Sequence, residues 1–188
     1  FLVAGFWILD SGFWIQGVIG QSVKVIELMN ANVLEFDKDA GNNVKHLIGN
    51  VVFKHEDALM YCDSAYLYSD ENRLDAFGHV HINKSDSVHI YGDMLQYDGN
   101  TRLAEIHQNV KMESKDFNLK GNNLSYDMKN SRATYHDGAT IDDIRNGSTL
   151  MSRRGIYFSA TRFFFFRDSV RLKHPEYTIA TDSLRYSP

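Results

Sequence analysis

Three histidines have a spacing that could bring imidazole rings together around a metal ion. His79 and His81 are two residues apart, which places both side chains on one face of a β-strand, and His107 lies further along the chain. Two imidazoles do not complete a zinc site, and no cysteine or acid cluster accompanies them. We therefore expect a solvated strand face here, and we predict neither a metal nor another cofactor.

Three aspartates, Asp63, Asp93 and Asp182, suggest the carboxylate pair that hydrolyses glycosidic bonds. They occur at equivalent places in successive segments, and Asn122 and Arg154 occupy further equivalent places. A catalytic pair should occur once, whereas a structural residue recurs. The sequence also has no nucleophile elbow, phosphate loop or zinc-binding helix motif. It predicts no enzyme.

Cations cluster near the end of the chain and could meet phosphate groups, although surface charge without a role explains them equally simply. They are Arg153, Arg154, Arg167, Arg171 and Lys173. The chain as a whole has a net charge of −4, so it lacks the basic surface typical of nucleic-acid binding.

The run Phe163 to Phe166 departs from the pattern around it. Phe164 and Phe166 fit the inward positions of a strand, which leaves Phe163 and Phe165 on the outer face. The two outer rings are covered by a neighbouring loop or form a patch that binds a partner. Cys62, the only cysteine, is expected on the polar face and excludes an internal disulfide.

The elements that position these residues repeat with a period of about 30 residues. Val51, Val80, Val110, Ala139 and Val170 are 29, 30, 29 and 31 residues apart, and each has another apolar residue two places later. A second column comprises Tyr68, Tyr97, Tyr126, Phe158 and Tyr186. Within each copy the apolar residues alternate with polar ones, which is the pattern of a half-buried strand.

Short turns rich in Asp, Asn, Ser and Gly separate the strands, so the sequence predicts an antiparallel meander. Glycines near the middle of the strands predict a bend there, which lets one strand serve two facing layers. The fold class is therefore all-β, an elongated jelly-roll-like stack of bent strands roughly 50 Å long. Eleven strands are expected, near residues 24–36, 44–53, 58–68, 73–82, 87–97, 102–112, 116–126, 132–141, 149–158, 162–172 and 177–187.

The first twenty residues are almost uniformly apolar and differ from the rest. Residues 1–20 are interpreted as the remnant of a signal peptide, with a retained membrane anchor as the alternative. Asp10 near their centre disfavours the anchor, because a carboxylate in the bilayer is costly. Residues 21–188 are expected to form one β-repeat domain that is truncated at its C-terminus.

Segments spread over most of the chain carry a family resemblance. The runs LIGNVVFKHEDALMYCDSAYLYSDENRLDAFGHVHI, YGDMLQYDGNTRLAEIHQNVKM and SRRGIYFSATRFFFFRDSVRL resemble the OstA-like family, which includes the periplasmic protein LptA and the N-terminal domain of LptD. His107-Gln108 and Arg153-Arg154 depart from the glycine pattern of the other copies. The resemblance implies a periplasmic protein that transports lipopolysaccharide and binds the acyl chains of lipid A in an apolar trough.

The inward columns would supply that trough, and plain core packing is the alternative for each residue. The candidate lipid-binding residues are Phe53, Tyr61, Tyr66, Tyr68, Ile82, Ile90, Leu95, Tyr97, Met112, Phe117, Leu119 and Tyr126. Open strand edges at both ends of the stack predict end-to-end addition of further copies, or of homologous domains of the transport machinery.

Two other functions remain open from sequence. A structural or adhesive β-repeat protein of outer-membrane assembly would show the same patterns around a filled interior. A carbohydrate-active β-helix enzyme would stack parallel coils, which the short turns disfavour.

Overall fold

The computed structural model describes residues 24–36, 43–84 and 88–188. Residues 1–20, for which a signal remnant is expected, lie outside this range. Within it, no helix is long and apolar enough to span a membrane.

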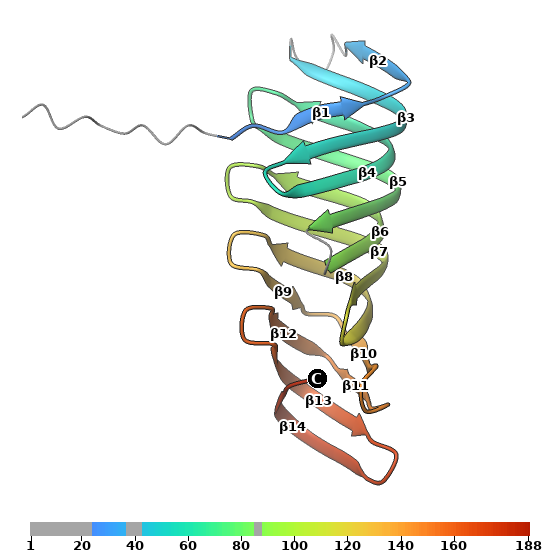
Figure 1. The fold of residues 1–188 in the computed structure, drawn as a ribbon, viewed down its shortest axis with the longest axis vertical. Helices are drawn as coiled ribbons and strands as arrows, with labels where there is room; N and C mark the ends of the chain where they lie inside the picture. Colours follow the sequence, from blue (N-terminus) through green and yellow to red (C-terminus); the bar gives the residue numbers. More distant parts are fainter. Residues whose placement is uncertain (1–23, 37–42, 85–87) are drawn as a thin grey trace, which may run out of the picture.

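The described residues form one antiparallel sheet of fourteen strands, which confirms the predicted all-β class. Figure 1 shows the strands stacked along the long axis, roughly in chain order. They are β1 (Glu27–Asn30), β2 (Val33–Phe36), β3 (Val44–His55), β4 (Ala58–Tyr68), β5 (Arg73–Lys84), β6 (Val88–Asp98), β7 (Leu103–Ser114), β8 (Phe117–Asp127), β9 (Arg132–Tyr135), β10 (Ala139–Asp143), β11 (Thr149–Ser152), β12 (Arg154–Phe158), β13 (Phe163–Lys173) and β14 (Thr178–Tyr186).

Three of the expected strands are each divided into two. Residues 24–36 give β1 and β2, residues 132–141 give β9 and β10, and residues 149–158 give β11 and β12. Two of the breaks lie side by side, because the Gly138 N–H donates to the Arg153 carbonyl at 2.9 Å. Gly138 has φ +105°, which ordinary side chains rarely adopt, so regular strand pairing stops there.

The unbroken strands β3, β5, β7 and β13 bend at a β-bulge near their middle. Pairing with the neighbouring strands skips two residues at each bulge. Both skipped residues have positive φ in all four strands, and such extra residues turn the strand sharply. The bulge pairs are Gly49-Asn50, Gly78-His79, Gln108-Asn109 and Asp168-Ser169.

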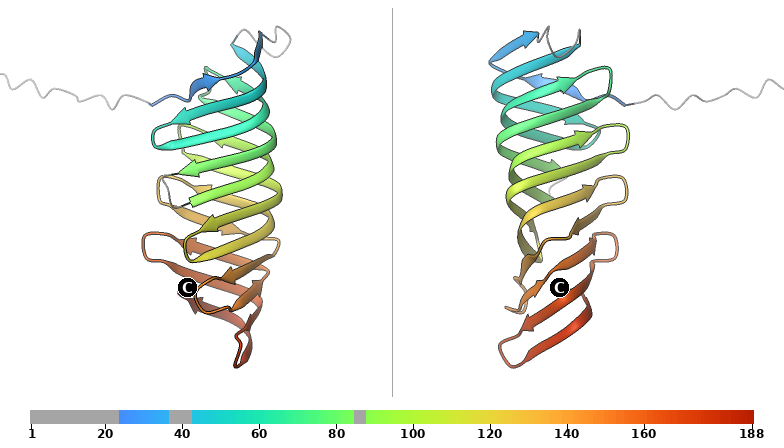
Figure 2. Two further views of the ribbon diagram at one scale, coloured as in Figure 1. Left: turned by 45° about the vertical axis from the view of Figure 1, so that its right-hand side comes forward. Right: turned by 180° about the vertical axis from the view of Figure 1, so that it is seen from behind.

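The bends fold the sheet into two arms, and Figure 2 shows the strands curving around one side of the molecule. The first arm ends in the turns near residues 56–57, 85–87, 115–116, 144–148 and 174–177, which we call the first rim. The second arm ends in the turns near residues 69–72, 99–102, 128–131 and 159–162, which we call the second rim.

Candidate functional site

The inner surface of the first arm carries one row of apolar side chains that crosses the strands through directly paired positions. Every step along the row is a register pair between neighbouring strands. The row runs Leu28, Phe53, Met60, Ile82, Ile90, Met112, Leu119, Ile141, Leu150, Leu172, Ile179.

The inner surface of the second arm carries a parallel row that includes several aromatic rings. It is again continuous through register pairs and runs Leu67, Leu74, Tyr97, Ala104, Tyr126, Ala133, Tyr157, Phe164, Tyr186. The alternation of apolar and polar residues therefore produces two apolar strips along the length of the stack.

Nine of the twelve candidate residues lie in the interior as predicted, each with 0–1 % of its surface exposed. They are Phe53, Ile82, Ile90, Leu95, Tyr97, Met112, Phe117, Leu119 and Tyr126. Their contact with lipid stays a prediction.

The other three candidates, Tyr61, Tyr66 and Tyr68, lie on the outer face of β4, so their predicted interior position is wrong. The buried residues of this strand are Met60, Cys62, Ala65 and Leu67. The column that aligned Tyr68 with Tyr97 is one residue out of register, and a shift of one residue moves a side chain to the opposite face. Cys62, predicted on the polar face, is buried for the same reason.

The outer tyrosines of β4 are held by neighbours on that face. The Tyr66 ring stacks on His46 with a centroid separation of 4.5 Å, and the Arg73 guanidinium lies 3.8 Å from the centre of the Tyr68 ring. Tyr61 stacks on His81, 5.4 Å between centroids. Aromatic side chains in this strand therefore cover the outside of the sheet, and the smaller residues fill the inside.

The inner surfaces of the two arms pack against each other. The ring of Phe117, at the first rim, lies 4.7 Å from Tyr157 and 4.8 Å from Phe164, both in the second-arm row. Burial raises the pKa of the Tyr126 and Tyr157 hydroxyls, since an ionised phenolate is poorly solvated there. The space between the arms is a closed apolar core.

A line of polar contacts, which we call the seam, joins the two rims along the length of the stack. Arg102 pairs with Glu56 at 2.7 Å, and Arg162 pairs with Asp116 at 3.4 Å. The remaining contacts are hydrogen bonds: Ile26 N–H to Asn72 (2.8 Å), Lys84 to the Met128 carbonyl, and the Tyr186 hydroxyl to Asp143 (2.5 Å). Each contact joins residues 43 to 46 positions apart in the chain.

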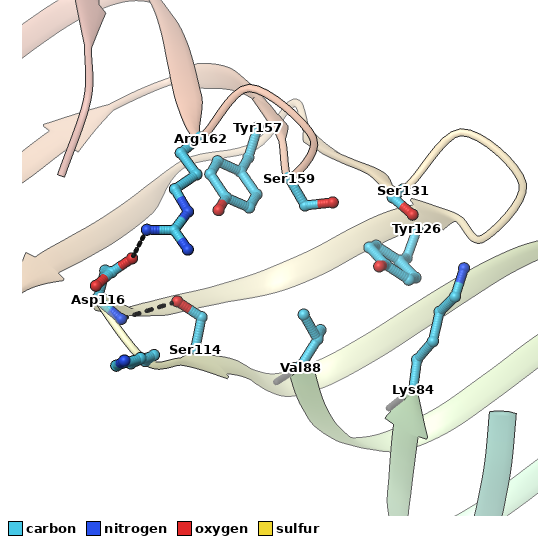
Figure 3. A pocket seen from close by; sticks show the side chains of 10 residues that line it. Lys84, Val88, Ser114, Asp116, Tyr126, Ser131, Tyr157, Ser159 and Arg162 are labelled. Carbon is cyan, nitrogen blue, oxygen red and sulfur yellow. Dashed lines mark hydrogen bonds and ion pairs between the residues drawn. The ribbon is translucent and has the colours of Figure 1, made fainter. Parts of the chain in front are cut away.

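The seam surrounds a pocket of about 200 Å³ that reaches the edge of the core. Figure 3 shows Val88, Tyr126 and Tyr157 beneath the opening, with Lys84 at one end and the Arg162–Asp116 pair at the other. Apolar interior and charged rim therefore meet here within one opening, as an amphiphile with an apolar chain and an ionic head requires.

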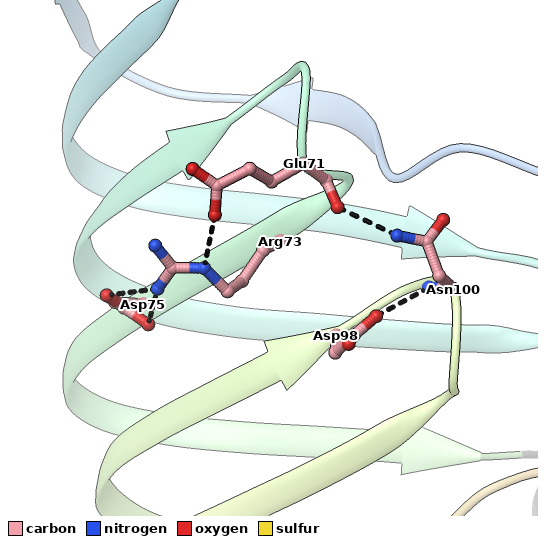
Figure 4. Close-up of polar contacts among 5 residues, drawn as sticks. All are labelled: Glu71, Arg73, Asp75, Asp98 and Asn100. Atoms are coloured by element: carbon pink, nitrogen blue, oxygen red, sulfur yellow. Dashed lines mark hydrogen bonds and ion pairs between the residues drawn. The ribbon is translucent and has the colours of Figure 1, made fainter. Parts of the chain in front are cut away.

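Neighbouring turns of the second rim are also tied to each other. Arg73 donates to Glu71 at 3.0 Å and to both carboxylate oxygens of Asp75, while the Asn100 side chain donates to the Glu71 carbonyl at 2.8 Å. Figure 4 shows these contacts linking the β4–β5 turn to the β6–β7 turn. The second rim is thus a braced edge.

The structure separates the three histidines that were considered as metal ligands. The His79 side chain is 91 % exposed and bonds Asp63 at 2.7 Å, and this carboxylate raises the pKa of the imidazole. His81 lies between Tyr91 and His89, and His107 bonds Asn123 at 2.6 Å. Among the described residues, no group of three or more His, Cys, Asp or Glu side chains is arranged to hold a metal.

The recurring aspartates bind across the bends. Asp63 contacts His79, and Asp93 accepts a hydrogen bond from Asn109 at 2.6 Å. At the β13 bulge the polarity is reversed, with Arg154 on Asp168. These carboxylates hold the second bulge residue or its neighbour in place.

Apolar side chains are exposed at both ends of the stack. At the N-terminal end, Val33, Leu34 and Phe36 of β2 have exposed fractions of 44–63 %. At the C-terminal end, Tyr177 and Ile179 are 51 % and 37 % exposed. Both ends therefore present the kind of apolar surface that another strand would cover.

The sequence reasoning missed the seam. Its partners lie about one and a half repeats apart, and only the recurring charges in turns one period apart gave a signal. Arg102 and Arg162, for example, occupy the turns after β6 and β12.

Comparison with known proteins gives a family and a structural neighbour. Residues 23–182 match the family described as OstA-like protein. No curated protein matches the sequence. One solved match is the crystal structure of LptH from Pseudomonas aeruginosa, described as the LptA-homologous periplasmic component of the conserved lipopolysaccharide transport device. The identity is 18 % and the TM-score 0.48, over 55 % of this chain and 76 % of that chain.

Proposed function

This chain belongs to the OstA-like protein family, and from that premise we propose that it carries the acyl chains of lipopolysaccharide between the arms of its sheet in the periplasm. The observation that carries the proposal is the pair of unbroken apolar rows, which cross the strands from β3 to β14. Each buried CH₂ group contributes about 0.8 kcal/mol, so one acyl chain of about a dozen carbons costs on the order of 10 kcal/mol to expose to water.

Carriage requires the arms to part, because their inner surfaces are in contact. Acyl chains would replace the contacts that Phe117 makes with Tyr157 and Phe164. Apolar contacts are non-directional, so one set substitutes for another at little cost. The ligand would then lie along the rows with its polar head at the seam.

The seam is the side on which opening is easiest. Arg162 and Arg102 have exposed side-chain fractions of 63 % and 36 % in their ion pairs, and exposed pairs contribute only about 0–1 kcal/mol each. Opposite the seam, the bends are covalently continuous through β3, β5, β7 and β13. We therefore propose that acyl chains enter sideways between the rims.

Photo-crosslinking with matched tyrosine positions tests lipid contact. Tyr97 and Tyr126 face inward, and Tyr68 and Tyr91 face outward, so p-benzoylphenylalanine replaces a residue of similar shape at each site. We expect adducts with lipid A from positions 97 and 126 only. Equal labelling from positions 68 and 91 would exclude the interior as the binding site.

Locking the rims together tests sideways entry. Asp116→Cys and Arg162→Cys place two exposed thiols across the seam for a short bis-maleimide. Native Cys62 is buried with its pKa raised to about 12, so it should react slowly. The linked protein should lose lipid binding, whereas a protein alkylated with a monofunctional maleimide should keep it. Undiminished binding after linking would mean that lipid enters from the ends.

We further propose that the ends join other copies, or homologous β-repeat domains, by strand addition. The exposed apolar residues of β2 and the free edge of β14 support this. Leu34→Cys and Ser183→Cys in two separate preparations should form a mixed disulfide dimer if β2 meets β14. A dimer formed equally well by Lys111→Cys would show random collision instead.

A second candidate is a structural β-repeat domain that carries no lipid. The tight interior favours it, because Phe53, Ile82 and Phe117 have no exposed surface. The two functions separate on one measurement. A structural domain would give no lipid adduct from positions 97 and 126 while remaining fully folded.

A further inference from the structure

Charge is distributed very unevenly along the chain. Residues 149–188 contain seven Lys and Arg against three Asp and Glu, a net charge of +4. Residues 1–148 contain 13 against 21, a net charge of −8. The C-terminal end of the stack is therefore a positive region on an otherwise negative molecule.

The outer face of β12–β14 combines this charge with aromatic rings. Ile156, Phe165 and Arg185 form one cross-strand row, and the next row contains Arg154 and Arg167. The Phe165 ring is 43 % exposed. It packs edge-on against Phe158, with 5.9 Å between the ring centres. Apolar and cationic side chains thus lie in adjacent rows on one side of the sheet.

Several of the cations on this face are available to an external anion. No ion pair within the described residues involves Arg167, Arg171 or Lys173. Arg185 lies over the Phe163 ring, 3.9 Å from its centre, and Arg154 is paired with Asp168. The positive charge is therefore not neutralised internally.

A groove of about 440 Å³ crosses the same face. Arg154 and Arg167 line it together with His136, and Ile156 and Phe165 supply apolar lining. It lies on the outside of the sheet, separate from the seam and the interior rows. A phosphate group would be held by the guanidinium groups while apolar atoms next to it contact Phe165.

We infer that the outer face of β12–β14 docks on a membrane surface bearing anionic phospholipid headgroups. Arginine binds lipid phosphates, and exposed aromatic rings partition into the headgroup region beside them. The negative remainder of the molecule is repelled by the same surface. Docking therefore places the C-terminal end of the stack at the membrane and directs the β1–β2 end away from it.

Vesicle flotation of the full chain tests this inference. Phosphatidylcholine vesicles are compared with vesicles that also contain phosphatidylglycerol, at low and high salt. We expect binding only to the anionic vesicles, and loss of that binding at high salt.

Charge reversal identifies the face. Arg167→Glu with Arg171→Glu should reduce vesicle affinity roughly tenfold or more. Phe165→Ser should also weaken binding at low salt. The matched control is Lys54→Glu with Lys129→Glu, which changes the net charge equally at exposed sites on β3 and the β8–β9 turn. The control should bind as the unaltered protein does, and circular dichroism confirms that all variants are folded.

Three results would overturn the inference. One is the absence of binding to anionic vesicles, and another is equal loss in the control, which would indicate net charge alone. The third is release of the protein from vesicles by soluble glycerophosphate at matched phosphate concentration, which would indicate a small-anion site.

Discussion

The two halves of the stack solve the same folding problem in different ways. In the first half, β3, β5 and β7 pass through the bend as continuous strands, each with a two-residue bulge. In the second half, β9–β10 and β11–β12 are interrupted at the bend, at Gly138 and Arg153, and only β13 is continuous. The first half is acidic and the second basic.

What the halves share is the inward rows. The first-arm row passes from Met112 and Leu119 to Ile141 and Leu150 without a break, although the bend changes between them. Side-chain burial therefore fixes the register, whereas the bend tolerates either a bulge or an interruption. The predictions below test this division of roles.

The largest effect is expected where the halves meet. Phe117 of β8 is fully buried and packs on Tyr157 and Phe164 of the second half. Phe117→Ala should lower the free energy of unfolding by about 3–5 kcal/mol through lost burial and a cavity. Urea unfolding measures it. Phe165→Ala, which changes an exposed ring, should cost well under half as much, and equal costs would contradict the assigned interior.

The glycines of the two bends should respond differently to a methyl group. Gly78 has φ +74°, and an added Cβ would lie 2.4 Å from an Asp63 carboxylate oxygen. Gly138 also has positive φ, but its nearest atom would be 4.0 Å away. Gly78→Ala should cost about 1–3 kcal/mol, and Gly138→Ala less, since only backbone strain acts there. Equal losses in thermal or urea unfolding would show that the side-chain contact is irrelevant.

The histidines of the first half should make its stability depend on pH. Burial, and secondarily His89, lower the pKa of His81 below its unfolded value of about 6.5. The folded protein then binds fewer protons than the unfolded chain, so stability should fall as the pH drops through that value. His79, whose pKa Asp63 raises, acts in the opposite sense.

Urea midpoints measured across this pH range check the sign. His81→Gln should flatten the fall in stability, and His79→Gln should steepen it. A fall of unchanged slope in His81→Gln would assign it to other groups.

The smallest effect concerns a departure from the glycine pattern. Gln108 occupies the first bulge position of β7 with φ +63°, where β3 and β5 have glycine. A left-handed residue costs about 1–2 kcal/mol, and glycine loses about 0.5–1 kcal/mol in chain entropy. Gln108→Gly should therefore stabilise the protein by roughly 0.5 kcal/mol. Glu105→Gly on the same strand should destabilise it, and stabilisation there would refute the reasoning.

The sequence predicts the bend column well because that column has small tolerance. Val51, Val80 and Val110 are buried as expected, and so are Ala139 and Val170. At the bend the arms come together, so a β-branched or small residue recurs in each copy. The strand ranges from β3 to β8 are also close to those predicted from the turns.

The tyrosine column fails because aromatic identity is not a measure of burial. Tyr68 aligns with Tyr97 at 29 residues, but the register pairs connect Leu67 through Leu74 to Tyr97, at a spacing of 30. The same shift affects Phe158, whose inward neighbour is Tyr157. The seam is unpredictable for another reason, since it depends on how far the sheet climbs between one rim and the other.

That climb has a consequence for how the chain could be cut or extended. Every clasp between the rims joins residues about 45 positions apart, while the repeat is about 30 long. No thirty-residue module can latch shut by itself; it borrows its latch from its successor. Excising an internal module should therefore unfasten its predecessor as well, and a neighbour docked beyond β14 could fasten what this chain leaves open.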